Sequence, residues 1–161
     1  MTVKSNKPRT LAATKILVKN ARKKGKKIVT TNGCFDILHV GHVRSLTAAK
    51  QLGDVLVVGI NSDASVRALK GKSRPIVPER ERAEMLAALE PVDAVFVFRE
   101  KDPKKWLAEL KPDIHVKGRE HKINEYIEKD TVERGGGKLA LISLRKGKST
   151  TNIIKKIQEG K

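Results

Sequence analysis

Hydrophobic residues occur along the chain in two alternating patterns. Short, nearly continuous apolar runs cover residues 27–31, 54–60, 94–98, 113–117 and 138–144. Runs of this length, bounded by polar residues, predict buried β-strands. Between them, apolar residues recur every three or four positions, which predicts helices over 9–24, 41–52, 61–69, 79–90 and 124–134, and from about 103 and 149 onward. In the segment 79–90, Met85, Leu86 and Leu89 are expected on one inward face.

This alternation of strands and helices predicts the fold class. Successive β and α units of this length form a mainly parallel sheet, with helices on both faces and right-handed crossovers. The prediction is therefore an α/β fold with about five strands. Residues 1–26 are expected to form an N-terminal helix and basic linker packed on a single domain over 27–161, and the loop 70–78 contains Pro75 and Pro78, which argue against regular structure.

Composition limits the class of protein. The chain has 161 residues, 39% of them hydrophobic, which is enough for one core. Its single cysteine, Cys34, cannot form an internal disulfide, and no apolar run approaches the ~18 residues that span a bilayer. We therefore expect a soluble cytoplasmic protein with no membrane partner.

Charge suggests the nature of the ligand. Lys and Arg total 35 against 18 Asp and Glu, a formal net charge of +17. This excess favours an anionic partner: nucleic acid, an acidic membrane or a phosphorylated small molecule. Only 3% of residues are aromatic, which disfavours the stacking used to bind single strands. We interpret the basic run 19–27 as a solvated helix end rather than a nucleic-acid-binding arm.

The segment TNGCFDILHVGH, residues 31–42, carries the clearest chemical signal. It follows the first predicted strand, so Asn32, Gly33 and Cys34 are expected in the exit loop. His39 and His42 are three apart at the start of a helix, where both imidazoles can face one ligand. Gly41 lets a bulky group approach the backbone, and helix N-termini attract anions. The pattern favours phosphate binding, although His-x-x-His can also bind a metal. We expect His115 and His121 to be ordinary core or surface residues.

This segment resembles the signature of the nucleotidylyltransferase superfamily, a Phe-Asp pair followed by His-x-Gly-His. More narrowly it is similar to the cytidylyltransferase-like branch, over about residues 10 to 159. The similarity includes LGDVLVVGINSDASVRALKGKSRP (52–75), ERERAEMLAALEPVDAVFVF (79–98), PDIHVKG (112–118) and KSTTNIIKKI (148–157). It implies a Rossmann-like fold and an enzyme that joins a nucleotide to a phosphorylated acceptor with release of pyrophosphate.

The resemblance also implies roles for individual residues. His39, His42 and Lys70 would be catalytic, with Lys72 as the second choice for the lysine that reaches the phosphates. The nucleotide and phosphate groups would be bound by Thr31, Asn32, Gly33, Cys34, Phe35, Gly41, Lys117, Gly118, Ser149, Thr150 and Thr151. Substrate contacts are expected from Asp36, Asp63, Lys72, Arg74, Arg82 and Arg145. For some of these a structural role is the alternative: Asp36 as a loop-fixing carboxylate, Asp63 and Ser149 as helix caps, Arg82 as a structural residue at the start of a helix, and the loop 70–74 as a solvated basic segment.

The substrates expected from the resemblance are ATP and a sugar 1-phosphate. The segments TNGCFD, KGKSRP and STTNIIKKI fit the heptose branch better than the glycerol 3-phosphate cytidylyltransferase branch, so the expected acceptor is D-glycero-β-D-manno-heptose 1-phosphate. Flavin-nucleotide or pantetheine-phosphate adenylylation, glycerol 3-phosphate cytidylylation and a basic nucleic-acid-binding module remain alternatives. Mg²⁺ is the expected cofactor, with no protein ligand identified, and a homodimer is a fair expectation. Such modules are frequently fused to a sugar kinase, whereas this one is expected to be separate.

Overall fold

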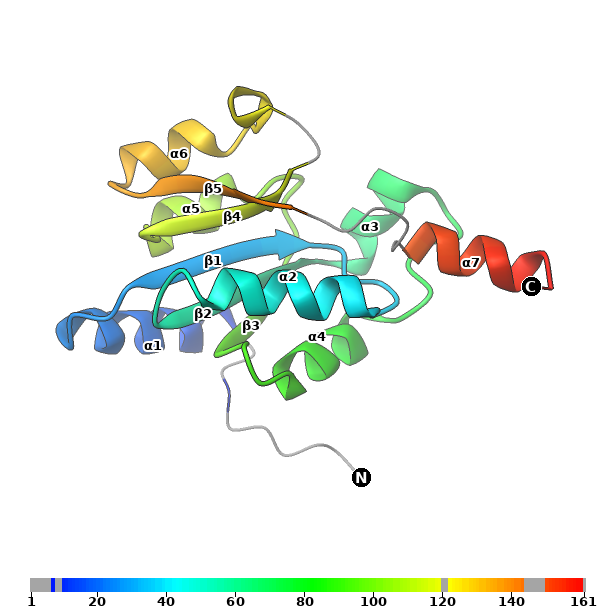
Figure 1. Ribbon diagram of the computed structural model, residues 1–161, viewed down its shortest axis with the longest axis horizontal. Helices are drawn as coiled ribbons and strands as arrows, with labels where there is room; N and C mark the ends of the chain where they lie inside the picture. Colours follow the sequence, from blue (N-terminus) through cyan, green and yellow to red (C-terminus); the bar gives the residue numbers. More distant parts are fainter. Residues whose placement is uncertain (1–6, 8–9, 120–121, 144–149, 161) are drawn as a thin grey trace.

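The five predicted strands form one parallel sheet. The computed structural model describes residues 7, 10–119, 122–143 and 150–160. Its strands are β1 (Ile28–Gly33), β2 (Val55–Asn61), β3 (Ala94–Phe98), β4 (Ile114–Gly118) and β5 (Lys138–Ile142). They lie in the order β3-β2-β1-β4-β5, and each neighbouring pair is parallel. The predicted α/β class with about five parallel strands is confirmed (Figure 1).

Helices cover both faces of this sheet. They are α1 (Leu11–Lys23), α2 (Val40–Lys50), α3 (Asp63–Lys70), α4 (Glu79–Ala88), α5 (Lys104–Leu110), α6 (Lys129–Arg134) and α7 (Thr150–Gln158), with a 3₁₀ turn η1 (Ile123–Glu125). Buried residues of α2 and α4 belong to one hydrophobic cluster, and those of α1, α5 and α6 to another. Figure 1 shows α7 extending from one end of the sheet. Among the described helices, none combines the length and the apolar character needed to span a membrane.

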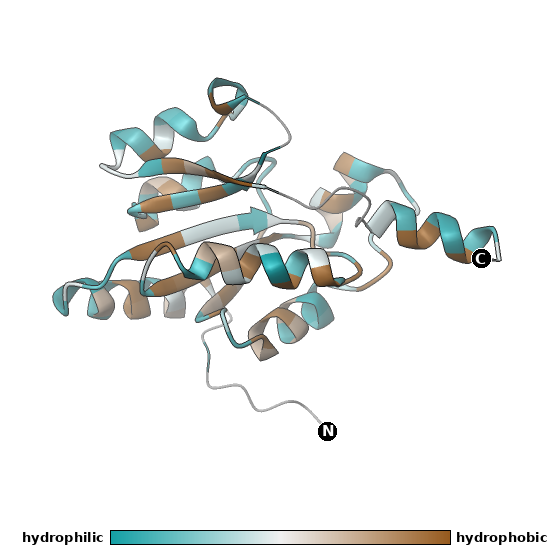
Figure 2. Cartoon of the chain, in the orientation of Figure 1, coloured by the Kyte–Doolittle hydropathy of each residue, from teal (hydrophilic) through white to brown (hydrophobic). Residues whose placement is uncertain are grey.

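Strand β2 shows why the sheet has two cores. It is buried along its whole length and pairs on both sides, with β1 and β3. Val55 and Val57 point into the cluster with α1 and α5, whereas Leu56, Val58 and Ile60 point into the cluster with α2 and α4. This alternation is the period of two that strand geometry imposes. A strand covered on both faces needs hydrophobic residues at every position, which is why its sequence is a continuous apolar run (Figure 2).

Four expectations about the elements are corrected. The first strand continues through Asn32 and Gly33, because their pairing with β2 extends to Gly59 and Ile60, so only Cys34 of the predicted exit loop leaves the strand. The segment 124–134 is not one helix: η1 ends at Glu125, and the Tyr126 hydroxyl donates to the Gly118 carbonyl before α6 begins. The final strand ends at Ile142 rather than 144. Met85 is 36% exposed and does not share the inward face of Leu86, which is fully buried.

Candidate active site

The reversal of strand order places a site between β1 and β4. From β1 the chain builds outward through β2 and β3, and it then returns to the other side of β1 to form β4 and β5. In open parallel sheets the crevice at such a reversal, outside the carboxyl ends of the strands, is where ligands bind. Here those ends carry Asn32 and Gly33 on β1 and Lys117 and Gly118 on β4. The Thr31 hydroxyl donates to the Val116 carbonyl at 2.9 Å and ties the two strands together.

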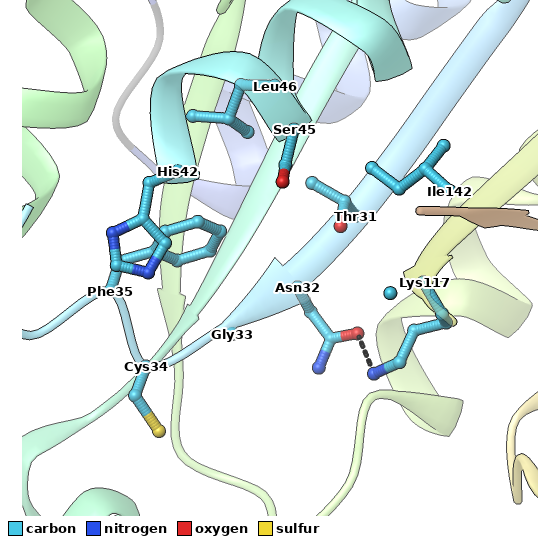
Figure 3. Close-up of a pocket in the computed structure, with 11 residues that line it drawn as sticks. Thr31, Asn32, Gly33, Cys34, Phe35, His42, Ser45, Leu46, Lys117 and Ile142 are labelled. Atoms are coloured by element: carbon cyan, nitrogen blue, oxygen red, sulfur yellow. Dashed lines mark hydrogen bonds between the residues drawn. The ribbon is translucent and has the colours of Figure 1, made fainter. Parts of the chain in front are cut away.

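A cavity of about 210 Å³ opens at this point, and we call it the histidine pocket. In Figure 3, His42 and Phe35 lie on one side of it, and Asn32 and Lys117, joined by a 3.2 Å hydrogen bond, lie on the other. Its lining residues are Thr31, Asn32, Gly33, Cys34, Phe35, His42, Ser45, Leu46, Lys117, Gly118 and Ile142. The structure therefore brings together eight of the sequence-predicted site residues. Ser45, Leu46 and Ile142 were not predicted, although Ser45 lies one helical turn after His42 and that spacing could have indicated it.

His39 stands before the helix rather than in it. It is the N-cap of α2, and its Nδ1 accepts a hydrogen bond from the Gly41 backbone N–H at 3.1 Å. Because Nδ1 is an acceptor, the proton of the neutral ring must be on Nε2. The ring stacks on that of His42, with centroids 3.9 Å apart. The two imidazoles thus lie together at the helix N-terminus, as their spacing predicts, but through a capping bond rather than a shared helical face.

His42 is held as a neutral ring. Burial, reinforced by the neighbouring His39, lowers the pKa of His42 from 6.5 to about 4. Its Nδ1 is buried and meets no hydrogen-bond partner among the described atoms. A buried polar atom without a partner costs about 1–3 kcal/mol. His42 at neutral pH is therefore a neutral imidazole, which carries one N–H donor and one acceptor nitrogen.

This depressed pKa predicts a pH-dependent stability. An unfolded imidazole takes up a proton near pH 6.5, whereas folded His42 does so only near pH 4. Between these values the unfolded state binds more protons, so the free energy of unfolding must fall as the pH is lowered. We expect the wild type to lose more stability than His42→Gln between about pH 7 and about pH 4 in urea denaturation. Equal losses in the two proteins would show that the ring is not shielded from protonation.

The loop after β1 is fixed by buried polar groups. Arg82 of α4 has no exposed surface, and its guanidinium donates to the carbonyls of Cys34, Asn61 and Val77 and to the Asp63 carboxylate. These bonds hold the backbone where Phe35 adopts a positive φ of 48°. For Arg82 the structure thus favours the structural alternative over direct substrate contact. Asp63 does not take its alternative role as a helix cap: Ser62 caps α3 by accepting the Ser65 N–H at 3.2 Å, and Asp63, the first residue of α3, instead forms an ion pair with Arg82.

Asp36 and Arg74 form an ion pair with one another and do not line the histidine pocket. Asp36 is 1% exposed, forms an ion pair with Arg74, and accepts the backbone N–H groups of Ile76 and Val77 at 2.8 and 2.9 Å. This is the loop-fixing alternative for Asp36, because a carboxylate with all these partners has little left for a ligand. It fastens the loop after α3 to the loop after β1.

The cations of the loop 70–74 lie outside the histidine pocket. Lys70 is the exposed last residue of α3, and its charge acts on the Cys34 thiol. Lys72 is exposed. Burial raises the pKa of Cys34. The nearby charges of Lys70 and Arg82 lower it by less than burial raises it, so the thiol stays protonated and is not a nucleophile.

The start of α7 contacts the loop between β1 and α2, residues 34–39. The Thr150 hydroxyl donates to the Ile37 carbonyl at 3.1 Å, and Thr151 is exposed. Gly41 lies in the first turn of α2. Ser149, Arg145 and His121 lie outside the described residues, so their predicted roles remain predictions.

A second cavity of about 260 Å³ lies beside the first. Asn32 and Lys117 line both, so they form the partition between the two. The second pocket differs in chemistry, because polar and charged side chains dominate it: Asn61, Lys101, Asp102, Glu125, Tyr126 and Glu128. Two unlike pockets that meet at an amide and an ammonium group suit a reaction between two ligands.

Comparisons with known proteins agree with this site. A family model described as cytidylyltransferase-like matches residues 30–156. The chain is 54% identical over 136 residues to the bifunctional protein HldE of Syntrophotalea carbinolica, covering 84% of this chain and 28% of that protein. It is 49% identical over 154 residues to the bifunctional protein HldE of Geotalea uraniireducens, covering 96% and 31%. The chain thus spans less than a third of the length of these relatives.

A solved structure shares the fold. The lipopolysaccharide core biosynthesis protein from Thermoplasma volcanium is 34% identical and superposes with a TM-score of 0.63, covering 77% of this chain and 100% of that one. The family match includes both histidines, the ends of β1 and β4 and the start of α7, which are the elements that build the site. On these grounds the chain belongs to the cytidylyltransferase-like family of nucleotidyltransferases.

Proposed function

We propose that this chain transfers the adenylyl group of ATP to D-glycero-β-D-manno-heptose 1-phosphate, giving ADP-heptose and pyrophosphate. The observation that carries the proposal is the pair of unlike pockets that meet at Asn32 and Lys117, beside the stacked histidines. An acceptor phosphate oxygen attacks the α-phosphorus, a new P–O bond forms, and the bond to the β-phosphate oxygen breaks. The nucleophile is already an anion, so no general base is required.

The two pockets suit the two substrates differently. The histidine pocket offers imidazole donors to a triphosphate and apolar contacts from Leu46 and Ile142 to a base. The second pocket contains three carboxylates, from Asp102, Glu125 and Glu128, which would repel a triphosphate. The carboxylates of Asp102 and Glu125 are good partners for sugar hydroxyls, whereas Glu128 is buried against Lys117, and Lys117 can meet the single phosphate of the acceptor. We therefore place ATP in the histidine pocket and the sugar phosphate in the second.

The proposed catalysis is positioning and charge stabilisation. His39 through Nε2 and His42 donate to phosphate oxygens on one side of the reacting phosphorus, and Lys117 and the Asn32 amide act on the other. Such preorganised donors matter most where charge develops in the transition state. Lys70 and the first residues of α7 are proposed to close on the β- and γ-phosphates, which the pyrophosphate carries away.

Magnesium enters this proposal with the triphosphate. Among the described residues, no group of three or more His, Cys, Asp or Glu side chains could hold a metal ion. Asp36, in the loop between β1 and α2, is already bound to Arg74 and two backbone N–H groups. The described side chains do not supply a metal-binding set, so we place Mg²⁺ on the phosphate oxygens of ATP.

The choice of heptose rests on the resemblance of the segments TNGCFD, KGKSRP and STTNIIKKI to the heptose branch, and the relatives support it. The named HldE proteins are about half identical to this chain, and the solved relative is described as a lipopolysaccharide core biosynthesis protein. Acceptor identity is the part of the proposal to test first.

The test is pyrophosphate release in the presence of magnesium, with ATP, CTP or GTP crossed against heptose 1-phosphate, glycerol 3-phosphate or FMN. We expect turnover with ATP and heptose 1-phosphate alone. Turnover with a different pair would contradict the proposed substrates but would support the proposed nucleotidyl transfer. Failure of every pair, together with nucleic-acid binding that disappears when the lysines of 19–27 are changed to glutamine, would replace the proposal with the binding-module alternative.

A further inference from the structure

A buried histidine lies behind the partition between the two pockets. His115 of β4 has no exposed surface, and its neighbour in the sheet register is Thr30 of β1. Its Nδ1 is 2.8 Å from the Thr30 hydroxyl, and its Nε2 is 3.2 Å from Oδ1 of Asn32. The ring also packs edge-on against Trp106, with centroids 6.0 Å apart. His115 is thus a core residue with satisfied hydrogen bonds, as predicted, but one of its partners is an active-site side chain.

The donor and acceptor roles in this network follow from its members. Lys117 can only donate, and its Nζ lies 3.2 Å from the same Asn32 atom that faces His115. That atom must therefore be the amide oxygen. An oxygen acceptor requires the proton of His115 on Nε2, so Nδ1 accepts the Thr30 hydroxyl. Burial lowers the pKa of His115, which keeps the ring in this neutral form.

A buried carboxylate completes the network. Glu128 precedes α6, its side chain is 4% exposed, and its Oε1 is 2.9 Å from Nζ of Lys117. The same oxygen is 3.8 Å from Nε2 of His115. Burial alone would raise the pKa of Glu128, but His115 and Lys117 together lower it to about 2. The carboxylate is therefore ionised at neutral pH and fixes the Lys117 ammonium beside Asn32.

The consequence is a fixed direction for the Asn32 amide. Its oxygen accepts two hydrogen bonds, from His115 and Lys117, on the protein side. Its NH₂ group must then point away from these two donors; in Figure 3 the oxygen of Asn32 faces Lys117 and the amide nitrogen does not. An amide held in this way presents two donors to phosphate oxygens without any rearrangement on binding.

We propose that His115 and Glu128 are positioning residues, which orient the Asn32 amide and the Lys117 ammonium toward the phosphates of the two substrates. This inference rests on the proposed function for its catalytic part. Neither residue lines the histidine pocket, and Glu128 reaches the second pocket beside Lys117. Their effect on the reaction is transmitted through Asn32 and Lys117.

The main experiment is a double-mutant cycle between His115→Phe and Asn32→Ala. Phenylalanine keeps an aromatic ring at this position but removes the hydrogen bonds to Thr30 and Asn32. Loss of a hydrogen bond that orients a charged contact is expected to lower kcat about tenfold, with KM for ATP little changed. In the Asn32→Ala background the same change should have no further effect on kcat, because the group it positions is gone. An equal loss in both backgrounds would overturn the proposal, since it would show a general structural effect.

Glu128→Gln tests the second branch of the network. It keeps the shape and removes the charge, so kcat should fall in the wild type and not in a Lys117→Ala background. Thr14→Val is the matched control, because Thr14 is fully buried on α1 and its hydroxyl bonds only the Thr10 carbonyl among the described groups. It should lower stability and leave kcat unchanged. A loss from Glu128→Gln that persists without Lys117 would contradict the assigned role.

A readout without turnover separates this inference from the proposed function. The side-chain amide signals of Asn32 can be identified in a ¹⁵N–¹H spectrum by their absence from Asn32→Ala. We expect His115→Phe to shift them and Thr14→Val to leave them in place. If no substrate pair turns over but the signals move, the positioning role stands and the function fails. Unmoved signals would overturn the positioning role whatever the activity.

Discussion

Replacing His39 by asparagine is expected to lower the rate of pyrophosphate release by about 10²–10³-fold, with little change in the free energy of unfolding. Asparagine is a strong N-cap residue, so it can accept the Gly41 N–H that Nδ1 of His39 accepts at 3.1 Å. It has no group at the position of Nε2, the donor that the proposed mechanism directs at the transferring phosphate. The substitution thus separates the cap from the catalytic donor.

Thr10→Asn is the matched control for this experiment. Thr10 caps α1 by accepting the Ala13 N–H at 3.2 Å, away from the site, so the same type of exchange there should leave turnover unchanged. Urea unfolding of both variants measures stability, and release of pyrophosphate measures activity. An active His39→Asn protein would remove His39 from the mechanism. A loss of activity that only parallels a loss of stability would reduce the residue to a helix cap.

Replacing Arg82 by methionine is expected to destabilise the fold by about 3–5 kcal/mol. The reason is that Arg82 is fully buried and bonds three backbone carbonyls and the Asp63 carboxylate. Methionine preserves much of the volume but leaves all four acceptors without their donor. The Cys34 carbonyl is one of these acceptors, so the loop after β1 should loosen as well. This loop holds the Phe35 ring against the His42 ring, with the two ring centroids 5.1 Å apart.

Arg80→Met provides the control on the same helix, because Arg80 is exposed and its loss should change stability by about 0.5 kcal/mol or less. The single tryptophan, Trp106, is 1% exposed and reports unfolding through its fluorescence in urea. A similar stability for Arg82→Met and Arg80→Met would show that the buried network contributes nothing to folding.

The arrangement of strands and helices could be predicted from the sequence because it rests on local periodicity. The run 54–60 is apolar at nearly every position, and it became a strand covered on both faces. Alternation of such runs with helical spacing is compatible with few folds besides a parallel sheet. Local patterns do not predict element boundaries that depend on a hydrogen bond to a distant part of the fold. The spacing of residues 124–134 favours one helix, but the Tyr126 hydroxyl donates to the Gly118 carbonyl and the segment is interrupted there.

The sequence by itself also indicated that the ends of β1 and β4 and the residues around His42 gather at one place, since the carboxyl ends of parallel strands share one edge. It left their partners undecided. Asp36 meets Arg74 across a separation of 38 residues, and His115 meets Asn32 across 83. Whether a carboxylate binds a ligand or an arginine depends on which distant segment folds against it, and a local sequence pattern does not predict that segment. Only the tertiary structure turned Asp36 and Arg82 into anchors and placed His115 behind the Asn32 amide.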